Sequence, residues 1–298
     1  MSDERLKILF DTDIGSDIDD AVALAYLLCQ PRCELLGITT CTGQPVRRAE
    51  LASAVCRHVG RDDVPIHPGC GDGLMVPVRQ TAAAQAKALG NWPRRDDFEP
   101  NSAVEFLRRT VRQHPGEITL LAVGPMTNVA LLFATDPQIA GLLKQAVVMC
   151  GRFFSHMGGE WNAINDPHAT AVLYGAGPHA RPPKHVSFGL DVTCQCTMEA
   201  DACRRRMTAK VLEPVRDFAE VWFTRQQRPR ITFHDPLAAA CIFQPELCSY
   251  RQRPVLVPTE GPTAGWTVFH GQGENKPHHV AETVDAEGFF KHYFEIVK

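Results

Sequence analysis

An unusual density of carboxylates lies near the start of the chain, where five aspartates occur within ten residues: Asp11, Asp13, Asp17, Asp19 and Asp20. Five carboxylates cannot share a small volume unless a cation neutralises them. A set of oxygen ligands without a thiolate selects hard ions, chiefly Ca²⁺ or Mg²⁺. A helix N-cap would account for Asp19 or Asp20 but not for all five residues. The cluster therefore predicts a site for a divalent cation.

The segments on either side of this cluster predict how it is positioned. Residues 6–10 form an apolar run with the length of a buried strand. Apolar residues then recur at helical spacing from Ala21 to Leu28, so a helix is predicted to begin near the Asp19–Asp20 pair. Residues 34–40 read as a second strand, which completes a βαβ unit. Ligands of open α/β sheets bind at the carboxyl ends of the strands, where the acidic loop would lie.

The rest of the chain continues this alternation of strands and helices. Ser102 and Glu105 have the spacing of a capping box, at the start of a helix that ends near His114. Extended segments are predicted at 65–68, 118–123, 146–149, 186–190, 255–258, 266–269 and 280–284. Further helices are predicted from about residue 45 to 55 and at 82–89, 129–134, 199–224 and 286–295, and a loop at 151–167. With no internal repeat and no long linker, residues 1–298 are predicted to form a single domain.

The composition is ordinary for a globular protein, with 44% hydrophobic and 22% charged residues. A net charge of −3 suggests neither a nucleic-acid nor an anionic-membrane surface. No apolar run approaches the roughly 18 residues that a membrane span requires. The eleven cysteines are scattered, and no signal peptide is recognised at the N-terminus. A cytoplasmic location with reduced thiols is therefore expected.

Four further stretches follow predicted strands or open predicted helices: residues 124–130, 160–167, 189–193 and 234–238. Together with the acidic loop, their order from Ile8 to about Val284 resembles the nucleoside hydrolase family, the inosine–uridine-preferring nucleoside N-ribohydrolases. The resemblance implies an open, mostly parallel, Rossmann-like sheet flanked by helices. It also implies one tightly held Ca²⁺, a small-molecule nucleoside substrate and a homodimer or homotetramer. The implied reaction is hydrolysis of the N-glycosidic bond of ribonucleosides, which gives ribose and a free base.

The resemblance also implies roles for individual residues. The metal ligands would be Asp13, Asp20, Asp235 and the backbone carbonyl of Thr127. The residues that contact the nucleoside would be Asp19, Gln44, Glu160, Trp161 and Asn162. The imidazole of His234 resembles one that some members of the family place near the leaving base.

The chemistry of an N-glycosidic bond agrees with these roles, because the bond breaks through a sugar cation. Asp13 can accept the proton of the attacking water, and Glu160 supplies a carboxylate that favours the developing positive charge. Trp161 or Trp92 could stack on the base. An imidazole has an ordinary pKa near 6.5, so His234 could assist the leaving base at neutral pH.

Several readings stay open from the sequence alone. Residues 14–18 form a loop two residues longer than is common in the family, so Asp17 could join the metal ligands. The segment 76–95 lacks a His-Gly motif of several members, and the 151–160 loop lacks an Asn of the family, which leaves the preferred base undetermined. The sequence also leaves the choice between ribose and deoxyribose open. Asp235 before Pro236 could be only a helix cap, and His234 only structural. The alternative functions are a haloacid-dehalogenase-like phosphatase, a calcium-binding module and an inactive nucleoside-binding homologue.

Overall fold

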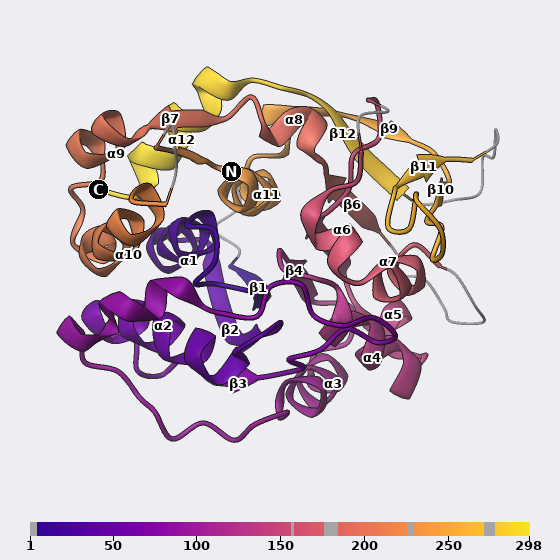
Figure 1. Cartoon of the computed structure of the whole chain (residues 1–298), viewed down its shortest axis with the longest axis horizontal. Coiled ribbons are helices and arrows are strands. Elements are labelled where there is room, and N and C mark those ends of the chain that lie inside the picture. Colours follow the sequence, from indigo (N-terminus) through magenta and orange to yellow (C-terminus); the bar gives the residue numbers. More distant parts are fainter. Residues whose placement is uncertain (1–4, 156–157, 176–183, 226–228, 271–277) are drawn as a thin grey trace.

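The central feature of the fold is an eight-stranded sheet, which is seen with its flanking helices in a computed structural model (Figure 1). In spatial order its strands are β3 (Ile66–Pro68), β2 (Cys33–Thr40), β1 (Leu6–Thr12), β4 (Ile118–Ala122), β5 (Gln145–Met149), β6 (His185–Phe188), β12 (His278–Val284) and β9 (Cys248–Gln252). Every neighbouring pair is parallel except β12 and β9, which run antiparallel. The predicted α/β class with an open, mostly parallel sheet is therefore confirmed. The structure describes residues 5–155, 158–175, 184–225, 229–270 and 278–298.

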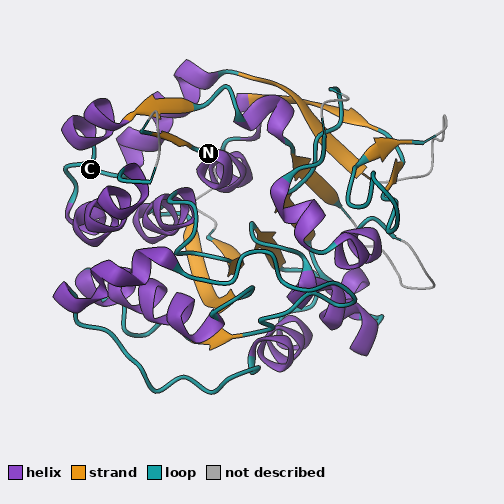
Figure 2. Cartoon of the chain, in the orientation of Figure 1, coloured by secondary structure: helices purple, strands orange, loops and turns teal. Residues whose placement is uncertain are grey.

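Helices cover both faces of the sheet (Figure 2). Side chains alternate along β1, so Ile8 and Phe10 pack into one hydrophobic core and Leu9 packs into the other. The first core holds α1 (Asp19–Cys29), α2 (Pro45–His58), α8 (Leu190–Thr193), α9 (Ala200–Arg206), α10 (Glu213–Phe223), α11 (His234–Phe243), α12 (Ala286–Ile296) and the 3₁₀ helices η1 (Ala84–Asn91), η2 (Lys210–Leu212) and η3 (Pro245–Leu247). The second core holds α3 (Ala103–Gln113), α4 (Thr127–Thr135), α5 (Ile139–Leu142), α6 (Trp161–Asn165) and α7 (Pro167–Leu173).

Neither the alternative cap at Asp19 or Asp20 nor the predicted capping box at Ser102 forms. The N-cap residue of α1 is Ile18, so Asp19 and Asp20 both lie in the first turn, where the helix dipole favours negative charge. Ser102 precedes α3 but makes no capping bond, because its hydroxyl donates to the Glu99 carbonyl at 2.9 Å. Glu105 pairs with Arg108 instead of completing a capping box.

Several element boundaries also differ from the prediction. β1 runs two residues further than expected, so Asp11 lies inside the strand. The segment 151–167, predicted as a loop, contains α6 and begins α7. β6 ends at Phe188, and residues 190–193 form α8. Three strands were not predicted: β9 and the pair β7 (Thr197–Glu199) and β8 (Arg230–Thr232). The short strands β10 (Val255–Leu256) and β11 (Val268–Phe269) pair with each other and lie within extended segments that were predicted.

Among the residues that the structure describes, no helix combines the length and the apolar composition that crossing a membrane requires. The single-domain organisation and the oligomeric state stay predictions.

Candidate active site

A cavity of about 510 Å³ opens at the carboxyl ends of the central strands, a volume typical of small-molecule sites. Its walls come from segments that are far apart in the sequence: the loop after β1, the start of α1, residues 79–82, the start of α6, the end of α10 and the start of α11. The lining residues are Asp13, Ser16, Asp17, Asp19, Asp20, Arg79, Gln80, Thr81, Ala82, Val123, Met149, Glu160, Trp161, Asn162, Leu190, Trp222, Arg225, His234 and Asp235.

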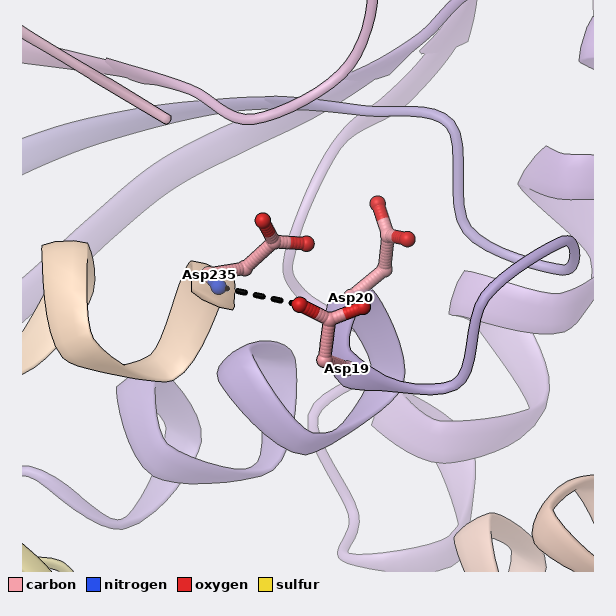
Figure 3. Close-up of side chains that lie close together, drawn as sticks. All are labelled: Asp19, Asp20 and Asp235. Atoms are coloured by element: carbon pink, nitrogen blue, oxygen red, sulfur yellow. Dashed lines mark hydrogen bonds between the residues drawn. The ribbon is translucent and has the colours of Figure 1, made fainter. Parts of the chain in front are cut away.

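Three buried aspartates form the acidic floor of the cavity (Figure 3). Asp19 and Asp20 stand in the first turn of α1, and Asp235 stands in the first turn of α11, which packs against α1. Each of them offers a carboxylate oxygen, and these oxygens lie within 4.8 Å of one another. The backbone N–H of Asp235 donates to Asp19 Oδ2 at 3.0 Å, which fixes the two helix starts together.

Asp13 lines the same cavity from the loop after β1. Its backbone N–H donates to Asp20 Oδ1 at 3.2 Å, and the hydroxyl of Thr12 donates to the same oxygen. The side-chain amide of Gln80 donates to Asp13 Oδ2. Asp13 is therefore held against the acidic floor, although it is outside the group of three closest carboxylates.

Asp11 is not part of the cavity, contrary to the reading of five clustered aspartates. It is fully buried in β1, where Oδ1 accepts hydrogen bonds from Thr39 and from Asn128 Nδ2, the latter at 2.8 Å. Burial raises the pKa of Asp11 to about 7. Asp11 therefore ties β1 to β2 and α4 and does not contribute to the site.

Burial and mutual repulsion raise the pKa values of the carboxyl groups in the cavity. Burial raises the pKa of Asp19 and of Asp20 well above the ordinary range, and neighbouring aspartates raise both further. The pKa of Asp235 rises for the same reasons. A divalent cation would replace the protons that these groups otherwise hold. The donor set therefore fits a hard cation such as Ca²⁺ or Mg²⁺.

Arg48 lies fully buried behind the acidic loop. Its guanidinium donates to the carbonyl oxygens of Thr42, Asp13 and Ile14 and, at 2.9 Å, to the hydroxyl of Ser16. Its charge lowers the pKa of Asp13, but burial of that carboxyl is the larger effect and the net shift is upward. Arg48 thus fixes the loop through backbone oxygens and only partly offsets the negative charge. No local pattern in the sequence marked this residue.

The long loop at 14–18 is also fixed from η1. Gln85 donates through its side chain to the carbonyl of Asp17 at 2.7 Å, and its N–H donates to the carbonyl of Gly15 at 3.0 Å. Gly15 has a φ of 113°, and an added Cβ would lie 2.5 Å from a methyl group of Leu51, so glycine is required there. The loop turns Asp17 to the cavity, where burial raises its pKa to about 7.

Glu160 and Asn162 line the cavity from α6. Glu160 is the N-cap residue of this helix and accepts hydrogen bonds from the N–H groups of Gly151, Asn162 and Ala163, at 2.7 to 3.0 Å. Burial raises the pKa of Glu160 to about 7. The side-chain amide of Asn162 donates to the carbonyls of Val123 and Met149, at the ends of β4 and β5. These bonds explain why a helix forms where a loop was predicted.

Two aromatic residues stand on the rim of the cavity. Trp161 is 47% exposed, and its indole N–H donates to Gln80 Oε1 at 2.6 Å. Trp222, from α10, also lines the cavity and was not predicted. Trp92, which was considered for stacking on the base, does not line the cavity. Its indole N–H donates to Asp217 Oδ2 at 3.0 Å.

Two predicted site residues are not in the cavity lining. The side chain of Gln44 accepts a hydrogen bond from the Ala83 N–H at 3.2 Å, and its contact with ribose stays a prediction. The hydroxyl of Thr127 donates to Asp166 Oδ2 at 2.8 Å, and Thr127 starts α4 beneath the cavity. Its role through a backbone carbonyl stays a prediction.

His234 is the first residue of α11 and lines the cavity beside Asp235. Its Nδ1 lies 2.7 Å from the hydroxyl of Thr193, on α8. Burial lowers the pKa of His234 to about 4, so its imidazole is neutral near pH 7.

The raised carboxyl pKa values predict how the stability of the metal-free protein depends on pH. Groups whose pKa is raised by folding bind more protons in the folded state, so stability falls as the pH rises through the raised pKa. The pKa values of Asp17 and Glu160 are about 7 in the folded protein and about 4 in an unfolded chain, so stability falls progressively from about pH 4 to about pH 8. We expect the Tm after chelation to be several degrees lower at about pH 8 than at about pH 6.

Thermal denaturation at both pH values, with chelator and with added Ca²⁺, measures this effect. Added Ca²⁺ should remove most of the difference, because a bound cation stabilises the ionised carboxylates. A chelated protein whose Tm is equal or higher at the higher pH would contradict the electrostatic description of the cavity.

Comparisons with known proteins agree with this arrangement. Residues 8–291 match the model of the family described as inosine-uridine preferring nucleoside hydrolase. Uridine nucleosidase 1 of Arabidopsis thaliana is 30% identical, covering 96% of this chain and 91% of the relative. The non-specific ribonucleoside hydrolase RihC of Salmonella paratyphi A is 30% identical, covering 95% of each chain. A solved purine-preferring ribonucleoside hydrolase from Gardnerella vaginalis superposes with a TM-score of 0.84 at 25% identity, covering 98% of both chains.

Proposed function

We propose that this chain, which belongs to the inosine–uridine preferring nucleoside hydrolase family and is a nucleoside N-ribohydrolase, hydrolyses ribonucleosides with the help of Ca²⁺. The products are ribose and a free purine or pyrimidine base. The observation that carries the proposal is the group formed by Asp19, Asp20 and Asp235 on the floor of a cavity that Glu160 and Asn162 also line. Membership of this family excludes two of the alternative functions, the haloacid-dehalogenase-like phosphatase and the calcium-binding module.

The cation would be held by carboxylates from two helix starts and the loop after β1. Asp13, Asp20 and Asp235 are the proposed ligands, with the carbonyl of Thr127 as a further one. Asp19 is proposed to accept hydrogen bonds from the ribose hydroxyls. When bound, a divalent cation would lower the pKa of a nearby water and help to orient the ribose hydroxyls.

The residues of the chain then divide the work of breaking the bond. Asp13 accepts the proton of the attacking water. Asn162 holds the sugar from the α6 side of the cavity. The carboxylate of Glu160 stabilises the positive charge that develops on the sugar as the C1′–N bond lengthens. Trp161 offers an aromatic surface to the base. The imidazole of His234 is proposed to assist the leaving base; the residue lines the cavity, and its Nδ1 contacts Thr193.

A panel of nucleosides tests the proposed function. Release of reducing sugar is measured with uridine, cytidine, inosine, adenosine, guanosine and deoxyuridine. The relatives include uridine nucleosidases and a purine-preferring enzyme, so both kinds of base belong in the panel. We expect turnover of at least one ribonucleoside, loss of activity after strong chelation and recovery with Ca²⁺. An inactive nucleoside-binding homologue would bind members of the panel without releasing sugar. Activity indifferent to chelation, with no stoichiometric metal by elemental analysis, would exclude the proposed cation.

Glu160→Gln and Asn162→Ala are expected to reduce kcat/KM by about 10²-fold, as removal of groups that stabilise the transition state does. Both residues lie on α6, apart from the acidic floor, so the affinity for Ca²⁺ should change little. Kinetics and Ca²⁺ titration by calorimetry are measured together. Asn165→Ala is the matched control, because Asn165 lies on the same helix outside the cavity lining. Loss of Ca²⁺ binding with intact sugar binding would reverse the two assignments.

A further inference from the structure

Two arginines stand on the rim of the cavity whose floor is acidic. Arg79 precedes Gln80, the residue that contacts both Asp13 and Trp161. Arg225 follows the end of α10, three residues after Trp222. Both arginines are exposed and both line the cavity, although they are far apart in the sequence. The cavity therefore combines a negative floor with two positive groups at its opening.

Neither guanidinium is neutralised by a carboxylate of the residues that the structure describes. Other surface arginines show what pairing looks like in this chain: Arg204 binds Glu220 at 2.7 Å, and Arg112 binds Asp136 at 2.7 Å. The acidic residues that line the cavity belong to the floor, to the loop after β1 and to the start of α6, which carry the proposed metal and ribose contacts. The positive charge on the rim is thus left available to a ligand.

An uncharged nucleoside has no anionic group that could pair with the two guanidinium groups on the rim. A carboxylate or phosphate does, because a guanidinium forms paired, charge-assisted hydrogen bonds with either group. Trp161 and Trp222 line the same cavity and offer flat surfaces to a base. Aromatic surfaces beside guanidinium groups match a ligand that carries a ring and an anion together.

We propose that the site takes ribonucleosides bearing an anionic group, a carboxylate on the base or a phosphate on the sugar, and that Arg79 and Arg225 bind this group. This inference rests on the proposed function of the same cavity and specifies its class of substrate. The anion remains on the rim, so it does not meet the carboxylates of the floor. Long-range attraction by the two arginines also draws such a substrate toward a cavity that would otherwise repel it.

The test compares three substrates that share uracil and ribose and differ in whether and where they carry an anionic group. They are uridine, orotidine (uridine with a carboxylate on its base) and uridine 5′-monophosphate. We expect the wild-type enzyme to have a higher kcat/KM for one of the two anionic substrates than for uridine. In the double variant Arg79→Ala/Arg225→Ala, the ratio of this value to that for uridine should fall by about 10-fold or more. Whichever anionic substrate shows the effect identifies the position of the anion.

Two further variants separate recognition from general charge. Arg205→Ala is the matched control, since Arg205 is an exposed arginine on α9 that does not line the cavity. It should leave the ratio unchanged. Arg79→Lys/Arg225→Lys keeps the charge without the paired geometry and should recover only part of the ratio. A wild-type enzyme without preference for either anion, or a ratio that the double alanine variant does not change, would overturn the proposal.

Binding measurements keep this inference distinct from the proposed function. Calorimetric titration of the three compounds into the Asp13→Asn protein at saturating Ca²⁺ reports affinity while turnover is slowed. If ribonucleosides bind but wild-type protein releases no sugar, the proposed hydrolysis fails while the anion preference is still decided by the ratio of Kd values. If sugar is released but the anion gives no advantage in kcat/KM or Kd, only the inference about the rim fails.

Discussion

Replacing Asp13 by asparagine is expected to lower kcat by about 10²-fold or more, the range for loss of a general base. Asp13 is the cavity carboxylate held by Gln80 and by a backbone bond to Asp20. Asparagine keeps the size of the side chain but cannot accept the proton of the attacking water. Steady-state rates at saturating Ca²⁺ measure the effect, and elemental analysis of the same sample reports whether the ion is retained.

Asp11→Asn supplies a matched control two residues earlier. Asp11 is as buried as Asp13 but lies outside the cavity lining, and its Oδ2 has no hydrogen-bond partner among the described residues. Asparagine can keep the Oδ1 contacts with Thr39 and Asn128, so this variant should retain turnover. Near-normal kcat in Asp13→Asn with full metal content would remove Asp13 from the role of base. Equal losses in both variants would indicate damage to β1 and not to the chemistry.

The acidic loop and its flanking elements were predictable because their signals are local. A short apolar run, a cluster of aspartates and a helical repeat of apolar residues lie within 6–28, and they form β1, a loop and α1. The side chain of Asp11 belongs to the sheet because β1 continues for two residues beyond its apolar run. Burying the carboxyl group of Asp11 in a strand costs free energy, which hydrogen bonds from Thr39 and Asn128 in distant segments offset.

The parts of the site that sequence reasoning missed depend on contacts between distant segments. Trp222 and Arg225 read as the end of an ordinary amphipathic helix, and only the packing of α10 beside η1 brings them to the cavity. Arg48 reads as a surface charge at the start of α2, but the carbonyl oxygens of the long acidic loop enclose it. The side chain of Gln44 likewise contacts a distant segment, because it accepts a hydrogen bond from the N–H of Ala83.

Strand β9 illustrates a different limit. Its residues, Cys248–Gln252, are mostly polar and partly exposed, because the strand lies at the edge of the sheet and pairs only with β12 among the described strands. An edge strand has no continuous apolar run to mark it. The helix α6 also lacks an apolar repeat that would mark it in the sequence. Its start depends instead on the buried cap supplied by Glu160.

Replacing His234 by alanine is expected to slow hydrolysis of inosine by about 10²–10⁴-fold, the range for loss of assistance by an acid. Hydrolysis of a nitrophenyl riboside should slow far less, because nitrophenolate leaves without a proton. Hypoxanthine is a poor leaving group unless a donor stabilises the electron pair that the base takes from the C1′–N bond. His234 lines the cavity beside Asp235, and its proposed partner is the base of a bound nucleoside.

The contact with Thr193 specifies how the imidazole would act. Burial lowers the pKa of His234 to about 4, so the ring carries a single N–H near neutral pH. When the hydroxyl of Thr193 donates to Nδ1 across 2.7 Å, the ring proton lies on Nε2, which can form a hydrogen bond to the leaving base and stabilise its electron pair. Thr193→Val removes the hydroxyl but keeps the volume of this buried side chain. We expect it to reproduce the same contrast between the two substrates with a smaller loss.

The dependence on pH distinguishes this role from that of an ordinary protonated histidine. Because the pKa of His234 is about 4, its charge does not change between about pH 6 and about pH 8. The ratio of wild-type to His234→Ala rates on inosine should therefore be constant across that range. A ratio that falls steeply with rising pH would mean that the charged imidazolium is the donor. Equal losses on inosine and on the nitrophenyl riboside, with or without lost Ca²⁺, would instead make His234 a structural residue that positions Asp235.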